Sequence, residues 1–333
     1  MSTVVTGACG FVGCNLVEHM LERGRTVVAV DRAETWPADA VERFDDLPGT
    51  VLFVAADVRD EAAVDAAFAL AAAEGGIDGV VHAAAITPGP EREVRDADLI
   101  AQVNYLGTLR VLAAAQRHGA RRLLYPSSAS VYGDAAFPDR PLDEAIDAPL
   151  PNAVYGIAKY AAERSALRLG GLWGIDVVSA RVGAVFGPWE RDTGLRDTFS
   201  GPMLATRAML RGERVVLARE GPRDWVYAAD VAGALVALLD APELAFTVYH
   251  VSAGRRWTLA DWCRALAGRL GAERFELAPD AADATLALGE RDRSPLRIDR
   301  LLGVYEPRYG LSEALPHYLA WLEARSSAWH EAW

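Results

Sequence analysis

The sequence predicts an α/β fold, in which helices cover both faces of a doubly wound parallel sheet and a smaller C-terminal lobe follows. Short, β-branched apolar runs alternate with helical stretches through the first half of the chain, and the first run leads into a glycine-rich turn. This alternation stops after Gly187-Pro188-Trp189. Such alternation is typical of parallel sheets, because parallel strands need a crossover connection. We expect residues 1–185 to form the sheet domain, with segments near 223–252 returning to it, and residues 186–222 and 253–333 to form the lobe.

The composition indicates a globular protein with a large core. The chain has 333 residues, 51% of them hydrophobic, and a net charge of -12 without a long basic run, which argues against nucleic-acid binding. Its three cysteines, Cys9, Cys14 and Cys263, lack metal-ligand spacing, so we expect a reducing compartment, no disulfide framework and no metal site. No apolar run reaches the length of a membrane span, and no signal peptide precedes the first strand. We therefore expect no membrane partner and a cytoplasmic location.

The first strand, expected over residues 3–6, runs into Gly7-Ala8-Cys9-Gly10-Phe11-Val12-Gly13, and the helix that follows ends at Gly24. Glycines permit the tight turn and let backbone amides and the helix N-terminus approach a pyrophosphate. The spacing is Gly-x-x-Gly-x-x-Gly rather than the commoner dinucleotide fingerprint. The expected phosphate contacts are Gly7, Gly10, Phe11, Val12 and Gly13.

A second strand, expected over residues 26–30, ends at Asp31-Arg32. An acidic residue about twenty positions after such glycines fits a hydrogen bond to a ribose hydroxyl. The Asp31 carboxylate would repel a 2′-phosphate, which favours NAD, whereas the neighbouring Arg32 keeps NADP as the second choice. The alternative interpretation of Asp31 is a solvated carboxylate at a strand end.

Two more strands are expected over residues 51–56 and 80–85. The first leads into Asp57-Val58, and the second ends in Ala83-Ala84-Ala85, whose small side chains allow a flat ring or a ribose to approach closely. His82 is interpreted as a packed histidine at the strand end rather than as a catalyst.

The later elements continue the alternation. Residues 87–98 carry Pro88, Gly89, Pro90 and mixed charges, which predicts a loop over the site that contributes substrate contacts. The other predicted elements are helices over 99–118, 155–170, 202–211, 229–239 and 258–270 and strands over 121–125, 176–182, 214–217 and 247–251.

The helix over 155–170 begins with Tyr155 and carries Lys159 one turn later. Side chains four positions apart share a helix face, so both polar tips project the same way. An ammonium beside a phenol stabilises the phenolate and lowers the tyrosine pKa from about 10. A tyrosine tuned in this way exchanges a proton near neutral pH, and the serine cluster at 127–130 can hold the reacting oxygen. The same spacing also occurs on ordinary helix surfaces.

Together these motifs resemble the extended short-chain dehydrogenase/reductase family, also called the NAD-dependent epimerase/dehydratase family, over nearly the whole chain. The resemblance implies a Rossmann-like sheet domain and NAD as the cofactor. The matching positions are Gly7, Gly10, Gly13, Asp31, Asp57, Val58, residues 82–85, Asn104, Gly107, Thr108, residues 127–133, Tyr155, Lys159, Gly187, Pro188 and residues 223–232.

The resemblance also implies roles for these residues. Tyr155 would be the acid/base, Lys159 would tune it and hold the nicotinamide ribose, and Ser128 would bind the reacting oxygen. Asp57 and Val58 would hold the adenine end of the cofactor. Further cofactor contacts are expected from Ala83, Ala84, Ala85, Asn104, Ser127 and Val182, and substrate contacts from Thr87, Ser128, Ser130, Arg191 and Arg223.

Two departures from the family pattern bear on the reaction. Family dehydratases carry an Asp-Glu pair after the serine or threonine, whereas this chain has Ala129 and Ser130, which argues against a dehydratase. Many sugar-nucleotide epimerases have a diphosphate-binding asparagine where this chain has Ala184. That difference weakens the nucleotide-sugar interpretation.

Three arginines bear on the charge of the substrate. Arg223 matches the family arginine that meets a substrate phosphate or carboxylate. Arg191 and Arg196 lie in the stretch expected to cover the site, where they either serve an anionic substrate or pair with nearby aspartates at the surface. We therefore expect a small-molecule substrate that can be anionic.

Three functions fit these motifs. The first is an NAD-dependent dehydrogenase of a sugar, sugar acid or polyol that releases NADH, and Ala184 favours it by a small margin. The second is a UDP-sugar 4-epimerase that retains NAD and returns the hydride to the other face. The third is a non-catalytic dinucleotide sensor, against which the presence of Ser128, Tyr155 and Lys159 argues.

We also expect a homodimer, because family members often pair through the helices at 99–118 and 155–170. The tryptophans Trp321, Trp329 and Trp333 are expected to dock on the lobe or on a partner. Small side chains that suit close helix packing, or that face the sheet instead, belong to Ala113, Ala114, Ala115, Ala158, Ala161 and Ala162.

Overall fold

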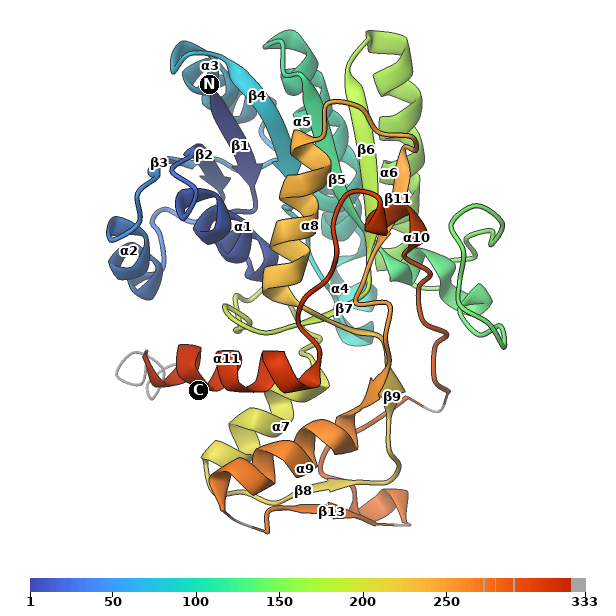
Figure 1. Cartoon of the computed structure of the whole chain (residues 1–333). Coiled ribbons are helices and arrows are strands. Elements are labelled where there is room, and N and C mark those ends of the chain that lie inside the picture. The colour runs from blue at the N-terminus through green and yellow to red at the C-terminus, as the bar shows by residue number, and fades with distance from the viewer. Residues whose placement is uncertain (272, 279, 290, 325–333) are drawn as a thin grey trace.

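The computed structural model describes residues 1–271, 273–278, 280–289 and 291–324. Its centre is a seven-stranded sheet in the order β11-β6-β5-β4-β1-β2-β3, with every pairing parallel (Figure 1). The order runs outward in both directions from β1 and β4, so the predicted doubly wound sheet is confirmed. The strands are β1 Ser2–Thr6, β2 Thr26–Asp31, β3 Thr50–Ala55, β4 Ile77–His82, β5 Arg122–Ser128, β6 Asp176–Val182 and β11 Val248–Val251.

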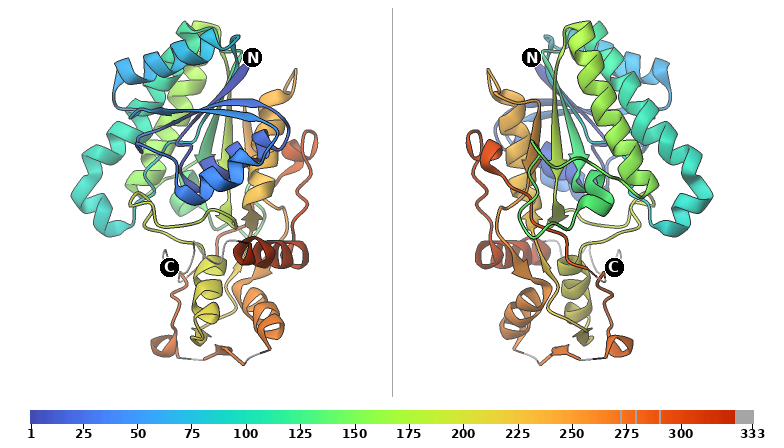
Figure 2. Two further views of the ribbon diagram at one scale, coloured as in Figure 1. Left: turned by 90° about the vertical axis from the view of Figure 1, so that its left-hand side faces the viewer. Right: turned by 90° about the vertical axis from the view of Figure 1, so that its right-hand side faces the viewer.

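Helices cover both faces of this sheet, as Figure 2 shows from two sides. Successive strand residues point to opposite faces. Val5 and Leu124 pack in one core with α1 and α8, whereas Val4 and Leu123 pack in the other with α3, α5 and α6. Burial on both faces explains why the strands are almost continuously apolar. The helices are α1 Phe11–Leu21, α2 Ala38–Asp45, α3 Glu61–Ala73, α5 Gly107–Arg117, α6 Val154–Trp173 and α8 Ala228–Asp240.

Two segments differ from the predicted elements. The sequence predicts a loop over residues 87–98, but the chain forms helix α4, Pro90–Ala101. Pro90 stands in the first turn together with Glu91 and Glu93, and this combination favours a helix N-terminus. The helix predicted over 99–118 is interrupted by a π-helix, η1 Gln102–Leu106, between α4 and α5.

The lobe lies beyond the carboxyl ends of the sheet strands (Figure 1). Phe186 is the centre of its aromatic core, with ring centroids 5.2 to 6.3 Å from those of Trp225, Tyr227, Trp257 and Trp262. The elements of the lobe are β7 Ala184–Phe186, α7 Gly201–Leu210, β8 Val215–Leu217, β9 Pro222–Arg223, β10 Trp225–Tyr227, β12 Trp257–Thr258, α9 Leu259–Leu270, β13 Phe275–Leu277, η3 Ala281–Asp283 and α11 Leu311–Glu323. Two short helices, η2 Ala129–Ala135 and α10 Asp299–Leu302, pack on the sheet domain instead.

Strand β11 brings the chain back from the lobe to the sheet. It pairs in parallel with β6, at the edge of the sheet. His250 of β11 is fully buried, and its Nε2 lies 2.6 Å from the hydroxyl of Tyr132 in η2. A residue from the far part of the sequence is thereby joined to the segment that follows β5.

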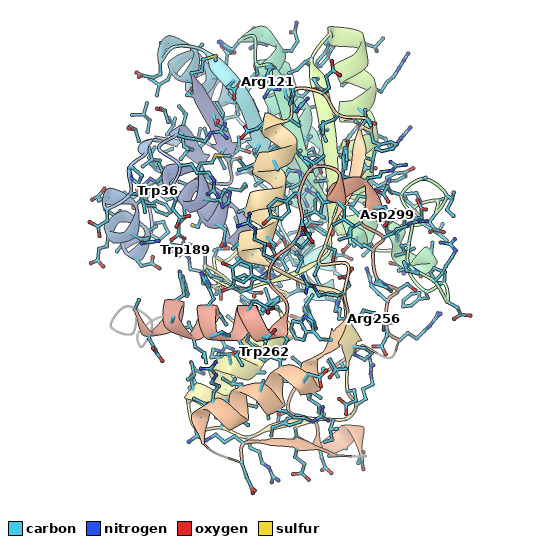
Figure 3. The ribbon with its side chains drawn as sticks, viewed as in Figure 1. Trp36, Arg121, Trp189, Arg256, Trp262 and Asp299 are labelled. Carbon is cyan, nitrogen blue, oxygen red and sulfur yellow. The ribbon has the colours of Figure 1, made fainter. Side chains whose placement is uncertain are left out.

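Trp189 fastens the lobe to the sheet domain (Figure 3). The side chain is fully buried, its Nε1 donates to Glu18 Oε2 of α1 at 2.6 Å, and its ring lies 5.5 Å from that of Trp321 in α11. Its φ of 67° is rare for a residue other than glycine. Trp321 thus docks within the chain, whereas Trp329 and Trp333 lie outside the described residues. Within the described residues, no helix has both the length and the apolarity needed to cross a membrane.

Candidate active site

A cleft of about 1210 Å³ runs along the carboxyl ends of the sheet strands, between the sheet and the lobe. This is where ligands bind in open parallel sheets. The glycine turn, the loops after β2, β3 and β4, the start of α6, parts of residues 191–201 and lobe residues near 286–293 line it. Segments far apart in the sequence therefore share one cavity.

The glycine turn leaves space that no other residue type would leave. Gly7 has a φ of 70°, and a Cβ there would lie 2.5 Å from Ala84 Cα. A Cβ on Gly13 would collide with the Gly7 carbonyl oxygen. Gly10, Phe11 and Val12 line the cleft at the N-terminus of α1. The turn therefore fits the pyrophosphate of a dinucleotide, which backbone amides at a helix N-terminus can bind.

Asp31 ends β2 beside this turn. Its Oδ2 accepts a hydrogen bond from Cys9 N at 2.9 Å, and its Oδ1 accepts one from Ala33 N at 3.0 Å. Each carboxylate oxygen keeps a further lone pair for a ribose hydroxyl. Arg32 lines the same wall.

Asp57 and Val58 extend this wall after β3. Arg59 engages the Asp57 carboxylate, with Nη2 to Oδ2 at 2.7 Å. This hydrogen bond holds the pKa of the Asp57 carboxyl below its usual range. Val58 packs so closely on α5 that a Cβ on Gly107 would lie 2.8 Å from its Cγ2. The wall at the expected adenine end is thus fixed by neighbouring elements.

Asn104 lies behind the wall rather than on it. Its Oδ1 accepts from Ile86 N at 2.8 Å, and its Nδ2 donates to Ile86 O at 2.9 Å. The side chain is 1% exposed. This position differs from the predicted direct cofactor contact, because both polar atoms of the Asn104 side chain are bonded to the backbone of Ile86. Asn104 instead fixes the segment that follows Ala83, Ala84 and Ala85, which do line the cleft.

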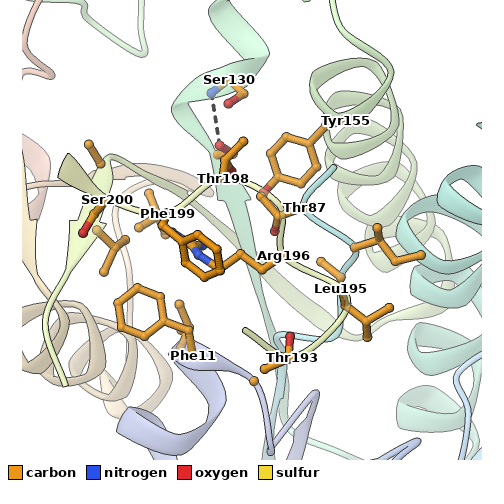
Figure 4. Close-up of a pocket in the computed structure, with 18 of the residues that line it drawn as sticks. Phe11, Thr87, Ser130, Tyr155, Thr193, Leu195, Arg196, Thr198, Phe199 and Ser200 are labelled. Carbon is orange, nitrogen blue, oxygen red and sulfur yellow. Dashed lines mark hydrogen bonds between the residues drawn. The ribbon is translucent and has the colours of Figure 1, made fainter. Parts of the chain in front are cut away.

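Ser128, at the end of β5, and Tyr155, at the start of α6, line the same part of the cleft, and Figure 4 shows Tyr155 there. Burial raises the pKa of the Tyr155 phenol, while hydrogen bonding to Ser128 and Thr87 and the charge of Arg196 act in the opposite direction. Ser128 Oγ also accepts from Ser130 N at 3.1 Å. The phenol and the serine hydroxyl are therefore placed to share one substrate oxygen.

Lys159 lies one turn along α6 and is 3% exposed. Its Nζ stands 4.2 Å from the ring centroid of Tyr125, a cation–π contact. Burial lowers its pKa from 10.5 to about 7, and the charge of Glu163 opposes this. In contrast to the spacing argument, the groups that lower the pKa of Tyr155 are Ser128, Arg196 and Thr87 rather than Lys159.

The start of α6 is held from α4. Glu93 Oε1 accepts a hydrogen bond from Tyr155 N at 3.0 Å, whereas the residue before the helix, Ala153, has no capping side chain. A carboxylate at this position also suits the positive end of the helix. The helix that sequence analysis interpreted as a loop thus positions the central tyrosine.

A strap, residues 187–200, crosses the cleft. Thr87 N donates to Leu195 O at 2.9 Å, and Asp197 N donates to Thr87 O at 3.0 Å. Arg92 of α4 adds two bonds to the Asp197 carboxylate, both at 2.7 Å. Figure 4 shows strap side chains projecting into the cavity. The strap and the segment after β4 therefore form one wall.

Arg191 lies at the glycine turn. Its Nη2 donates to Cys9 O at 3.2 Å, and its Nη1 is 3.3 Å from the Asp39 carboxylate. The partner Asp39 differs from the nearby aspartates that were predicted, and Arg191 also lines the cleft, so its substrate contact stays a prediction. Arg191 joins the strap to the expected cofactor end of the cleft.

Arg223 and Arg293 face the lobe end of the cleft. The Arg223 side chain is exposed, and its guanidinium lies 5.3 Å from the ring centroid of Trp225. In the part of the chain that the structure describes, neither guanidinium has a hydrogen bond or an ion pair. The sequence argument selected Arg223 but missed Arg293, for which the repeated arginines at 291 and 293 were the available indication.

Comparisons with known proteins agree with this geometry. The chain is 30% identical to a UDP-glucose 4-epimerase of Mycolicibacterium smegmatis, over 95% of this chain and 96% of the relative. It is 29% identical to a dTDP-glucose 4,6-dehydratase of Streptomyces antibioticus, over 99% and 94%. The solved UDP-glucose 4-epimerase of Thermus thermophilus in complex with NAD has a TM-score of 0.77 and 28% identity, covering 97% of this chain and 99% of that one.

The family comparison covers most of the chain. The model described as the NAD dependent epimerase/dehydratase family matches residues 3–254. This match confirms the resemblance predicted from the motifs and the expectation of NAD as the family's cofactor. The protein therefore belongs to the NAD dependent epimerase/dehydratase family.

Proposed function

We propose that the protein moves a hydride between retained NAD and a secondary alcohol of a nucleoside-diphosphate sugar, as a 4-epimerase. One observation carries this proposal: a single cleft runs from the glycine turn past Tyr155 to Arg223 and Arg293. Its volume of about 1210 Å³ exceeds the roughly 300–1,000 Å³ of a pocket for one small ligand. A dinucleotide and a second nucleotide-sized ligand fit such a space. The guanidinium groups of Arg223 and Arg293 suit a diphosphate.

The side chains around Tyr155 divide the chemistry. When bound, NAD supplies the hydride acceptor. Ser128 Oγ holds the sugar hydroxyl, and Tyr155 takes its proton as the carbon–hydrogen bond breaks. The Lys159 ammonium, held on the Tyr125 ring, would hold the nicotinamide ribose. The strap, which covers the cleft beside Tyr155, would keep water from the oxidised sugar.

Elimination of water is not part of the proposed reaction. A dehydratase needs an acid for the departing hydroxyl and a base for the neighbouring carbon. The positions after Ser128 carry Ala129 and Ser130, and a serine hydroxyl replaces neither carboxyl group. The dehydratase relative shows that the fold accommodates that chemistry, so these two positions carry the distinction.

A second candidate is an NAD-dependent dehydrogenase of a free sugar or sugar acid. Ala184 favours the dehydrogenase, because this residue of the cleft wall has no side-chain amide to bind a substrate phosphate. Both candidates use Ser128, Tyr155 and Lys159. They differ in whether NADH leaves the protein.

Absorbance of NADH separates the two. With UDP-glucose we expect conversion to the 4-epimer without net NADH, because the hydride returns to the same sugar. Arg223→Ala should raise the KM for the nucleotide sugar by about 10- to 100-fold, the usual value of charge-assisted hydrogen bonds, and leave NAD binding unchanged. Stoichiometric NADH from a free sugar, with no epimer from any nucleotide sugar, would establish the dehydrogenase instead.

We also propose a homodimer through the face formed by η1 and α6. Ala114, Ala115 and Ala162 are buried in the core between the sheet and its helices, and Ala158 is buried too, so they do not supply this surface. Exposed apolar side chains do, with exposed fractions of 39% to 59% at Leu106, Ile157, Leu172 and Trp173.

Light scattering tests the dimer. We expect wild-type protein at micromolar concentration to have twice the chain mass of 35.8 kDa. Leu172→Glu should yield monomers, because it places a charge within the buried apolar contact. Leu302→Glu, at an exposed leucine of α10, is the matched control and should remain dimeric. A monomeric wild-type protein would exclude this interface.

A further inference from the structure

Arg196 lies at the reacting part of the cleft, away from the two arginines of the lobe. Its guanidinium is 5.1 Å from the ring centroid of Phe11 in the glycine turn. Its backbone pairs with Thr87, whose side chain acts to lower the pKa of the Tyr155 phenol. Figure 4 shows the Arg196 side chain projecting into the cavity between Phe11 and Tyr155. A positive charge therefore stands next to the group that moves the proton.

Glu190 holds this arginine in place without satisfying it. Arg196 Nη2 donates to Glu190 Oε1 at 2.9 Å. The same carboxylate is fully buried and accepts from Ser200 N at 2.7 Å and from Ser200 Oγ at 2.5 Å, so its position is fixed by the strap. Among the described residues, Arg196 Nε is buried without a hydrogen-bond partner. A buried donor without a partner is costly, so Glu190 leaves the guanidinium incompletely paired, and the partly exposed remainder of the group lines the cavity, where an anion can reach it.

We propose that Arg196 binds a carboxylate on the sugar, so that nucleoside-diphosphate uronates are the preferred substrates. This inference rests on the proposed function. In a hexuronate the carboxylate is carried by the ring carbon next to C4, so a sugar held for reaction at C4 presents it close to Tyr155. The diphosphate then lies at Arg223 and Arg293. The spacing of positive charge along the cleft thus matches a substrate with two separate anionic groups, and a neutral sugar leaves Arg196 Nε unpaired.

The test compares UDP-glucuronate with UDP-glucose, which differ only in a carboxylate against a hydroxymethyl group. Titration calorimetry on NAD-loaded protein in the Tyr155→Phe background measures affinity without turnover. We expect the acid to bind at least about 10-fold more tightly than the neutral sugar. Arg196→Met should weaken the binding of UDP-glucuronate by about 10- to 100-fold and the binding of UDP-glucose by a few-fold at most. Arg211→Met, at an exposed arginine outside the cleft, is the matched control and should retain the preference.

Three results would overturn the inference. Equal affinity for the two UDP-sugars with Arg196 intact would show that the carboxylate is not recognised. If Arg196→Met lowered the affinity for both UDP-sugars equally, the arginine would be assigned to a group that the two ligands share. Weaker NAD binding in Arg196→Met, with the substrate preference kept, would assign it to the cofactor phosphates.

Failure of the proposed function gives a different result. In that case neither UDP-sugar binds, and a free sugar is oxidised with release of NADH. The same comparison is then made between glucuronate and glucose. A preference for glucuronate that disappears in Arg196→Met would support the role of Arg196. If the wild-type protein showed no preference for glucuronate, this role would be overturned.

Discussion

Tyr155→Phe is expected to lower kcat by about 1,000-fold while NAD affinity stays within a few-fold of wild type. The substitution removes only the phenolic oxygen, so the ring keeps its place beside Ser128 and Thr87. Without that oxygen, no side chain at this position takes the alcohol proton as the hydride leaves. Single-turnover absorbance measures the chemical step, and quenching of protein fluorescence measures NAD binding.

Tyr160→Phe is the matched control for this prediction. Tyr160 lies on the same helix but packs against the cluster around Val131 and Tyr132, outside the cleft. Its loss of a hydroxyl should leave kcat near the wild-type value. Wild-type turnover in Tyr155→Phe would remove Tyr155 from the mechanism, and equal losses in both variants would indicate a defect of folding.

Glu163→Ala is expected to lower the free energy of unfolding by about 3–5 kcal/mol. Glu163 is fully buried and binds Arg181 through Nη2 to Oε1 at 2.7 Å and Nε to Oε2 at 3.1 Å. Ser179 Oγ donates to the same carboxylate at 2.9 Å. Removal of the Glu163 carboxylate leaves the buried Arg181 charge without its counter-ion. Urea unfolding measures the loss, with the exposed Glu74→Ala as control, and a loss below about 1 kcal/mol would contradict the argument.

Glu163→Gln separates charge from packing. The amide keeps the volume but removes the negative charge that opposes the low pKa of Lys159, which burial has brought to about 7. The pKa of Lys159 therefore falls further. Because we propose that the protonated lysine holds the nicotinamide ribose, the alkaline limb of the kcat/KM profile should move to lower pH. An alkaline limb that stays at the wild-type pH would show that Glu163 acts on the fold alone.

The sheet and the glycine turn were predictable because their patterns are local. A strand buried on both faces needs a continuous apolar run, as at Val27 to Val30. A turn whose Cβ would collide with the segment after β4 needs glycine, as at Gly7. Tyr155 and Lys159 were predictable for the same reason, since four positions fix their shared helix face.

Features that depend on distant segments could not be predicted in this way. Residues 90–101 form a helix although Pro88, Gly89 and Pro90 indicate a loop, because the same proline also starts helices. Asn104 turns onto backbone through a π-helix that no spacing indicates. The proposed roles of Arg196 and Arg293 depend on their neighbours: Arg196 has the carboxylate of Glu190 beside it, and Arg293 has no ion pair among the described residues. Only the tertiary structure shows which carboxylates lie near each arginine.

Strand β11 has a consequence for the synthesis of this protein. The glycine turn and Tyr155 leave the ribosome early, but the edge of the sheet beside β6 stays open until Val248–Val251 arrives, between the two sequence segments that build the lobe. His250 then closes onto Tyr132. Contacts between such distant segments form slowly. A nascent chain therefore carries the glycine turn and Tyr155 well before the lobe residues near 286–293 that complete the cleft.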